Sequence, residues 1–215
     1  NGILQNRSDY LLFLSANDIL DLNFVESFKT SDWTYYPGVW SALARKFKNS
    51  PLNTKPVCSP IVSMRNGYFP PADCAKLFRR YLNWFTGTTS CFHRATIIES
   101  GCLEERLGGI ADWLLAVVLC FRSGCYFSPN YLCRIRIHGP GYLSKTLLKE
   151  GLAQSAVQYL NKKISPELQK YVPRERVISR IYINKLLTQK PAVFKKKSGQ
   201  SIKWHLRLTM QMFRT

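Results

Sequence analysis

The chain has 215 residues, of which 46% are hydrophobic and 13% aromatic, a composition that supports a buried core and excludes wholesale disorder. The formal net charge of +18 is unevenly distributed. Residues 1–138 carry 15 Lys and Arg against 10 Asp and Glu, whereas residues 139–215 carry 16 against 3. The basic C-terminal part therefore predicts an anionic partner, either a membrane surface or nucleic acid.

Cysteine usage and hydropathy indicate the cellular compartment and whether the chain spans a membrane. The seven cysteines form no Cys-x-x-Cys pair and no metal-finger spacing, which favours buried, reduced thiols in a cytosolic protein. The longest apolar run, from Trp113 to Phe121, is much shorter than the roughly 20 residues of a membrane-spanning helix. The chain does not begin with Met and soon enters an apolar stretch, so we expect that an earlier part of its domain is missing.

The first half of the chain predicts the alternation of strands and helices that is typical of an α/β domain. The continuous apolar run at 10–14 predicts a strand buried on both faces of a parallel sheet. Short polar residues at 15–18 end this strand, and the apolar spacing at 19–28 predicts a helix. We expect a second strand at 57–64 and a helix at 72–85. Because ligands bind at the carboxyl ends of strands in open α/β sheets, residues 15–18 lie at an expected binding edge.

The second half begins with a small polar loop at 86–90. The mostly apolar segment 110–121 predicts a helix that ends at Ser123-Gly124, and 125–137 predicts extended structure. Three basic segments with helical periodicity follow, separated by prolines: 143–163, 174–190 and 198–214.

Three segments, in this order and at this spacing, resemble family 2 glycosyltransferases of the GT-A fold. Residues 8–20 resemble the strand that ends in the family's metal-binding Asp-x-Asp. Residues 100–115 are similar to the family's glycine and acidic pair, followed by an Asp, here Asp112, that opens a helix. Residues 131–138 resemble the closing strand with its Arg and terminal His. The resemblance extends over residues 1–144.

This resemblance implies a partial GT-A α/β sheet with flanking helices over residues 1–143 and a basic, mainly helical tail over residues 144–215. It further implies that most of the nucleotide-binding half of the sheet is missing, so we expect this chain alone to be inactive. The implied reaction is an inverting transfer, of the hexosyltransferase type, from a nucleotide-diphosphate sugar to a glycan or lipid-linked acceptor.

The donor site that the resemblance implies is altered in this chain. A leaving diphosphate carries several negative charges, which a divalent cation stabilises as a Lewis acid. Both acidic positions of the family's Asp-x-Asp are changed, to Ser15 and Asn17, and only the next residue, Asp18, is acidic. The resemblance implies Mg²⁺ or Mn²⁺ bound by Asp18, Asn17 and His138, with Ser15 also near the diphosphate. The residues alone leave a second interpretation open, in which Asp18 caps a helix after a turn.

Asp112 is the predicted catalytic residue. An inverting transfer needs a base that takes the proton of the acceptor hydroxyl, and a carboxylate at the N-terminus of a helix suits this role. Asp112 occupies the family's base position. It also reads as the N-cap of an apolar helix, and the two roles are compatible.

Five further residues belong to the expected site. Arg134 and Arg136 alternate along the last expected strand and would either offset the diphosphate charge or be exposed to solvent. Trp84, Glu104 and Glu105 are expected at the acceptor, through ring stacking and hydrogen bonds to sugar hydroxyls, and the loop at 86–90 beside Trp84 is expected to line the acceptor pocket. Trp84 reads equally as a core residue, and the acidic pair as the charged start of a helix.

The C-terminal tail mixes cations with apolar residues, among them Trp204 and Phe213. Such a segment is typical of membrane interfaces, so we expect the tail to bind an anionic membrane surface. Together with this tail, the family resemblance implies a cytoplasmic protein on the inner face of the membrane, acting in polysaccharide biosynthesis for the cell envelope. A solvated helical tail remains an alternative, and the alternating apolar residues between 202 and 212 also leave a strand open. The sequence has no recognisable nucleic-acid module, so we expect no specific nucleic-acid partner.

The changed Asp-x-Asp positions also support a function of another class. In that alternative the chain is a catalytically silent glycosyltransferase-like domain that serves binding or scaffolding. An intact nucleotide-binding half would favour catalysis over this alternative.

Overall fold

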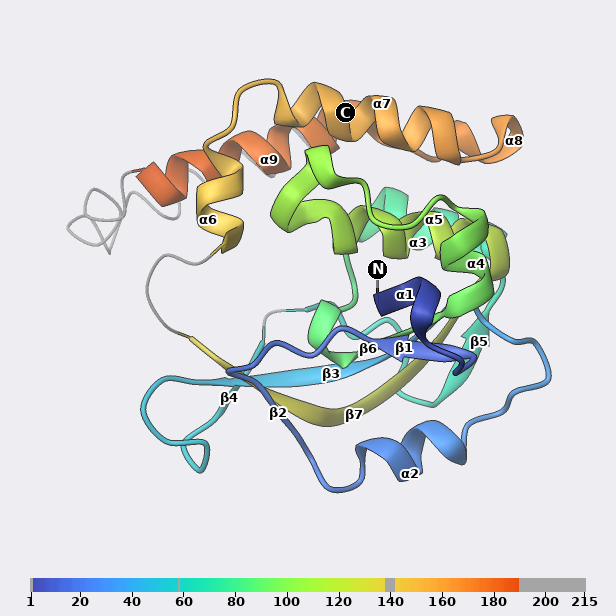
Figure 1. Ribbon diagram of the computed structural model, residues 1–215, viewed down its shortest axis with the longest axis vertical. Helices are drawn as coiled ribbons and strands as arrows, with labels where there is room; N and C mark the ends of the chain where they lie inside the picture. Colours follow the sequence, from blue (N-terminus) through green and yellow to red (C-terminus); the bar gives the residue numbers. More distant parts are fainter. Residues whose placement is uncertain (1, 58, 138–141, 190–215) are drawn as a thin grey trace.

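The computed structural model describes residues 2–57, 59–137 and 142–189. These residues form a mixed α/β fold in which a curled sheet carries helices on both faces (Figure 1). A short helix, α2 (Phe24–Lys29), lies on one face of the sheet. Two further layers of helices lie on the other face, so the fold class expected from the sequence is confirmed.

The sheet has seven strands, of which five follow the spatial order β1-β6-β3-β7-β2. β4 pairs with β3, and β5 pairs with β7. β3 and β7 are parallel, and the other pairs are antiparallel. The strands are β1 (Tyr10–Leu12), β2 (Ile19–Leu20), β3 (Val39–Phe47), β4 (Lys55–Pro56), β5 (Gly67–Phe69), β6 (Ser90–His93) and β7 (Cys125–Arg136).

The central strand β3 divides its side chains between two apolar clusters. Val39 and Leu43 belong to the large cluster on the α5 side, whereas Trp40 and Ala42 belong to a smaller cluster beneath α2. Alternate residues of a strand point to opposite faces, so β3 holds both layers of helices against the sheet.

The helices nearest the sheet are arranged around α5, which is apolar on all sides because it lies between the sheet and the outer helices. It ends at Gly124, whose φ of +74° favours glycine. A Cβ at Gly124 would lie 2.5 Å from the Phe69 carbonyl oxygen. The helices of this part are α1 (Gly2–Gln5), α3 (Pro71–Tyr81), α4 (Arg94–Glu99) and α5 (Ala111–Ser123), with the 3₁₀ helices η1 (Gly87–Thr89) and η2 (Glu105–Ile110).

The C-terminal helices form the outer layer and share the core of the sheet domain. Leu147, Leu160, Val177 and Ile181 are buried in the same apolar cluster as α5. The boundary expected between residues 143 and 144 falls within α6. These helices are α6 (Tyr142–Leu147), α7 (Leu152–Lys163), α8 (Pro166–Gln169) and α9 (Arg174–Gln189), and α7 and α9 lie side by side (Figure 1).

Three expectations for local structure were wrong. The strand at 10–14 is shorter, half-buried and antiparallel to β6, because an apolar run does not reveal the direction of pairing. Residues 19–28 are not one helix: Ile19–Leu20 pair with β7, and α2 begins only at Phe24. The described residues of 57–64 form no strand, since Pro60 lacks the N–H that a sheet ladder needs.

Two findings bear on the cellular setting. None of the helices in the three described ranges is both long and apolar enough to cross a membrane. The six cysteines that the structure describes are free thiols. The predicted tail segment 198–214 and its residues Trp204 and Phe213 lie outside the described residues.

Candidate functional site

The loop at residues 86–90 is the centre of the candidate site. Two buried hydroxyls fix it: Thr89 Oγ1 donates to the Ala42 carbonyl of β3 at 2.8 Å, and Ser90 Oγ donates to the Thr86 carbonyl at 2.8 Å. Both side chains are fully buried. Because buried hydroxyls are costly to leave unpaired, these bonds hold the loop on the sheet and set the positions of Gly87 and Thr88.

Asp18 binds the side of this loop that faces the end of β7. Its Oδ2 accepts a hydrogen bond of 2.8 Å from the Thr88 hydroxyl, and its Oδ1 accepts one of 2.9 Å from the Arg136 backbone N–H. The expected turn at 15–18 is present, because the Asp18 N–H donates to the Ser15 carbonyl. The alternative in which Asp18 caps a helix is wrong, since the strand β2 follows it.

Asp112 lies in the first turn of α5, where the helix dipole favours a negative charge. Ile110, and not Asp112, occupies the N-cap position. One carboxylate oxygen of Asp112, Oδ1, accepts a 2.7 Å hydrogen bond from the Trp113 backbone N–H. The other oxygen, Oδ2, lies so close to Gly87 that a Cβ on this glycine would be only 2.5 Å away. The loop therefore contacts Asp112 through a residue that has no side chain.

Burial is the main influence on the pKa of Asp112. It raises the pKa of the carboxyl group above the ordinary value for Asp, and the backbone N–H of Trp113 lowers it by a smaller amount. A carboxylate with a raised pKa is a stronger base than one in open solvent, which suits it to accept a proton.

Asp18 and Asp112, which are distant in sequence, thus contact neighbouring residues of one loop. Asp18 bonds to Thr88 and Asp112 contacts Gly87, and successive Cα atoms are about 3.8 Å apart. The resemblance predicts that both acids face one cleft together with His138; Asp112 lines the cavity described next, whereas Asp18 contacts the loop beside it. His138, which was expected to join them, lies outside the described residues.

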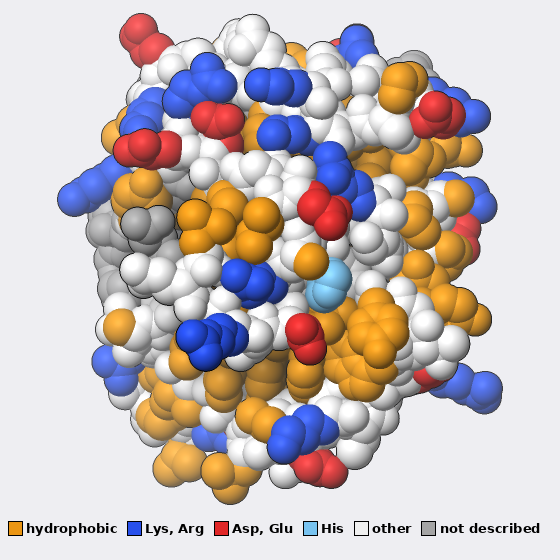
Figure 2. Space-filling view, turned by 45° about the vertical axis from the view of Figure 1, so that its right-hand side comes forward, with side chains coloured by type: hydrophobic (Ala, Val, Ile, Leu, Met, Phe, Trp, Pro, Cys, Tyr) orange, Lys and Arg blue, Asp and Glu red, His pale blue; other side chains and the backbone are white. Residues whose placement is uncertain are grey.

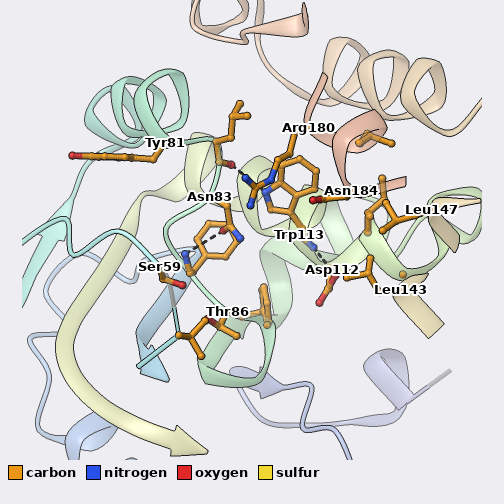
Figure 3. A pocket seen from close by; sticks show the side chains of 18 residues that line it. Ser59, Tyr81, Asn83, Thr86, Asp112, Trp113, Leu143, Leu147, Arg180 and Asn184 are labelled. Carbon is orange, nitrogen blue, oxygen red and sulfur yellow. Dashed lines mark hydrogen bonds between the residues drawn. The ribbon is translucent and has the colours of Figure 1, made fainter. Parts of the chain in front are cut away.

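A cavity of about 350 Å³ opens beside Asp112 (Figure 3). Its wall combines aromatic rings, amide groups and charged groups from the start of α5, the end of α3, α6 and α9. The Trp113 indole N–H donates to the Leu82 carbonyl at 3.1 Å, which joins α5 to the end of α3 at this wall. The labelled side chains of the wall are Ser59, Tyr81, Asn83, Thr86, Asp112, Trp113, Leu143, Leu147, Arg180 and Asn184.

The acceptor residues expected from the sequence do not line this cavity. Trp84 is fully buried in the core, packed against Phe85, so its ring cannot stack on a ligand. Glu104 accepts a hydrogen bond of 2.9 Å from Arg106 and lines a separate, smaller cavity, and this bond lowers the pKa of its carboxyl group. Glu105 is exposed at the start of η2. The core interpretation holds for Trp84, and the helix-start interpretation fits the acidic pair.

The expected donor residues are found near Asp18 but differ in their surroundings. Arg134 forms an ion pair with Asp21, so much of its charge is already offset. Arg136 is exposed, with its guanidinium carbon 5.3 Å from the centre of the Phe47 ring. Ser15 and Asn17 are exposed at the turn before Asp18. No group of three His, Cys, Asp or Glu side chains that could hold a metal ion occurs in the ranges that the structure describes.

Two residues of the cavity wall were not expected from the sequence: Arg180 and Asn184, which bring α9 to the cavity. The loop at 86–90 was expected to line an acceptor pocket, and its residues Thr86 and Gly87 line this cavity. The loop at 86–90 was visible as a polar interruption, but nothing local in the sequence pairs it with Asp18 or Asp112. The only signal for α9 was its helical periodicity.

The fold has counterparts among solved structures. No family profile and no curated protein matches the sequence. The chain is similar to TarS 1–349 of S. aureus in complex with UDP-GlcNAc, with a TM-score of 0.58 and 7% identity over 94% of this chain and 55% of that one. For TarS 1–349 the TM-score is 0.56 with 9% identity, over 94% of this chain and 54% of the other. For the complex of TarS 1–349 with UDP the TM-score is 0.50 with 12% identity, over 92% of this chain and 69% of the other.

These similarities define the fold of the chain. TarS is a glycosyltransferase, so the described residues have a glycosyltransferase-like fold. The chain spans about half the length of the first two structures. At 7–12% identity the comparison concerns the fold alone.

Proposed function

We propose that the complete protein is an inverting glycosyltransferase of the GT-A type, which moves a sugar from a nucleotide-diphosphate donor to a glycan or lipid-linked acceptor. The observation that carries this proposal is Asp112, a mostly buried carboxylate in the wall of a cavity within a glycosyltransferase-like fold. The nucleotide-sugar class is supported by the UDP-GlcNAc and UDP found with TarS.

Asp112 would act as the base. The Trp113 N–H holds one carboxylate oxygen, so the group has a fixed orientation beside the cavity. An acceptor hydroxyl in the cavity gives its proton to Asp112 while its oxygen attacks the anomeric carbon of the donor. The bond from that carbon to the diphosphate breaks, and the electron pair leaves with the diphosphate. Attack from the face opposite to the leaving group inverts the configuration.

Asp18 would serve the donor side. Each of its oxygens accepts one hydrogen bond within the protein and keeps a second lone-pair site. Mg²⁺ needs only one or two carboxylates when phosphates supply other ligands, so Asp18 with the Asn17 amide oxygen fits such an ion. When bound, Mg²⁺ or Mn²⁺ would offset the charge of the departing diphosphate.

One observation favours the silent binding domain as a second candidate. Both oxygens of Asp18 are already used to join the loop to β7, and Ser15 and Asn17 stand where the family has acids. In this second candidate Asp18 is structural, and the domain binds a nucleotide sugar without turning it over.

The proposal is tested with the complete protein, a panel of nucleotide sugars that includes UDP-GlcNAc, and Mg²⁺ or Mn²⁺. Calorimetry measures donor binding, a coupled assay measures nucleotide release, and NMR gives the anomeric configuration of the product. We expect metal-dependent release and an inverted product, and Asp18→Asn should weaken the response to metal. A retained configuration would contradict the proposal, and donor binding without release would favour the silent domain.

A further inference from the structure

Helix α9 carries a polar stripe, of which Arg180 and Asn184 line the cavity beside Asp112. Arg176, Arg180 and Asn184 are spaced four residues apart, so they lie on one face of the helix. Val177 and Ile181 are buried in the core on the neighbouring face. Their burial fixes the rotation of α9 about its axis and thereby the direction of the polar stripe.

Arg176 fixes the position of α9 along α3. Its guanidinium donates to the carbonyls of Arg79 and Arg80, the latter at 3.0 Å, at the C-terminal end of α3. Helix C-termini expose unpaired carbonyls and carry a partial negative charge, so a guanidinium is a favourable partner there. The next turn of α9 therefore brings Arg180 to the segment where α3 has just ended.

Arg180 reaches the cavity wall without a partner of its own. It lines the cavity with Tyr81 and Asn83, and within the described residues its side chain has no ion pair or hydrogen bond. Among the described residues of the same wall, Asp112 is the only acidic one, and it is not paired with Arg180. Arg180 is exposed, which places a guanidinium where the cavity meets solvent.

The rest of the wall suits a sugar ring. Trp113, Tyr81 and Phe85 provide aromatic surface, and Asn83 and Asn184 provide amide groups that can bond to hydroxyls. A volume of about 350 Å³ is at the lower end of small-molecule sites, so it admits a sugar ring with a substituent and not a long glycan segment.

We propose that this cavity binds an acceptor sugar that carries an anionic substituent, a phosphate or a carboxylate, and that Arg180 on α9 recognises that group. The inference rests on the proposed function, because it takes Asp112 as the base beside the same sugar. Arg presents a planar fork of donors that matches carboxylate and phosphate oxygens in pairs. Recognition of the acceptor thus depends on a helix of the C-terminal layer, beyond the sheet.

The test compares three probes, glucose, glucuronate and glucose 6-phosphate, by calorimetry and ligand-observed NMR on the complete protein. The variant Arg180→Gln removes the charge and keeps much of the side-chain length. Arg174→Gln is the matched control, since Arg174 lies on the same helix, is exposed and does not line the cavity. Glucuronate and glucose 6-phosphate distinguish a carboxylate from a phosphate preference.

We expect at least one anionic probe to bind about tenfold or more tightly than glucose, with a Kd on the order of 1 mM. Arg180→Gln should remove that advantage, whereas Arg174→Gln should keep it. Equal binding of all three probes, an advantage that survives Arg180→Gln, or no binding of any probe would each overturn the inference. Turnover that depends on Asp112 together with one of these results would leave the transferase function standing and remove only the anionic acceptor.

Discussion

Two opposing effects act on the negative charge of Asp112: its place in the helix stabilises the charge, and its burial destabilises it. The N-terminal end of α5 favours its negative charge, yet removal from water raises its pKa. Because the pKa of Asp112 is raised in the folded protein, the folded protein binds this proton more tightly than the unfolded chain does. The contribution of Asp112 to the free energy of unfolding is therefore highest below the unfolded pKa of about 3.9 and falls as pH rises through the folded value.

This linkage predicts the behaviour of Asp112→Asn. Because the ionised carboxylate costs stability at neutral pH, the variant should be more stable than the natural protein at pH 7. The difference should shrink as pH is lowered toward the unfolded pKa of about 3.9. Urea unfolding over a pH series measures it, and a variant that is less stable at every pH would contradict the account.

Gly87 is predicted to be essential because of the space it leaves. A Cβ at this position would lie 2.5 Å from Oδ2 of Asp112, and Gly87 has no positive φ that would strain alanine by itself. Gly87→Ala should therefore displace the carboxylate and lower kcat by about 10²-fold, with donor affinity unchanged. Kinetic assays check this against Gly67→Ala, where the new methyl group meets open space. Equal kcat values for the two variants would rule out the role of Gly87.

At the scale of residues, a position can be predicted from the sequence when its signal is local, but not when it depends on a contact between distant parts of the chain. Asp112 was singled out by the family resemblance, whereas the local pattern of a short polar residue before an apolar helical run gave only the N-cap position, which Ile110 occupies. The bond between Thr88 and Asp18 could not be predicted, since it spans 70 positions and forms only after β6 and β7 have each paired with β3. The burial of Trp84 likewise follows from tertiary packing and is not encoded in its neighbours.

At the scale of elements, the described C-terminal helices act as part of the domain and not as an appendage. α7 contacts α5 and α9, and Leu160 of α7 is fully buried in the shared core. Removal of buried methyl groups costs both transfer energy and the energy of the cavity that remains.

Leu160→Ala should therefore lower the free energy of unfolding by about 2–5 kcal/mol in a single cooperative transition. Leu186→Ala on α9 is the control, because Leu186 is 54% exposed. Urea unfolding followed by circular dichroism and by tryptophan fluorescence measures both variants. Separate transitions in the two signals, with the sheet domain unaffected by Leu160→Ala, would show an independent tail.

Elements were predictable where one local signal dominated. The apolar segment that became α5 and the long strand β7 were expected close to their observed bounds. The strand β3 was not predicted. Its side chains pack into two different apolar clusters, and two of its residues are alanines, which favour strands only weakly. The strand expected at 57–64 is not formed by the described residues, because the prediction relied on apolar content and ignored Pro60, which cannot donate to a sheet ladder.

At the scale of the whole molecule, the distribution of positive charge bears on the surface that the protein binds. On the face shown in Figure 2, Lys and Arg side chains are spread among hydrophobic ones and are not gathered into one patch. The tail beyond residue 190 holds a further cluster of cations with Trp204 and Phe213, outside the described residues. We propose that this tail places the protein on an anionic membrane surface at the inner face of the membrane.

Vesicle co-sedimentation tests this placement. Each Lys or Arg near an anionic surface contributes about 1 kcal/mol, and inserted aromatic groups should leave binding that resists salt. The complete protein should bind anionic vesicles more than neutral ones, and removal of residues 191–215 should abolish most of the binding. Equal binding with and without these residues would contradict a membrane role for the tail, and equally tight binding to DNA would reduce it to a nonspecific polycation.

The central claim is that Asp112 takes the proton from an acceptor in a glycosyltransferase reaction. Its most direct test is the turnover of Asp112→Asn in the complete protein, measured with the nucleotide sugar that the natural protein uses. Asn keeps the shape and the hydrogen bond to the Trp113 N–H but cannot accept the proton. The account predicts a fall in kcat of about 10²–10⁴ with donor affinity unchanged. Turnover close to that of the natural protein would contradict it.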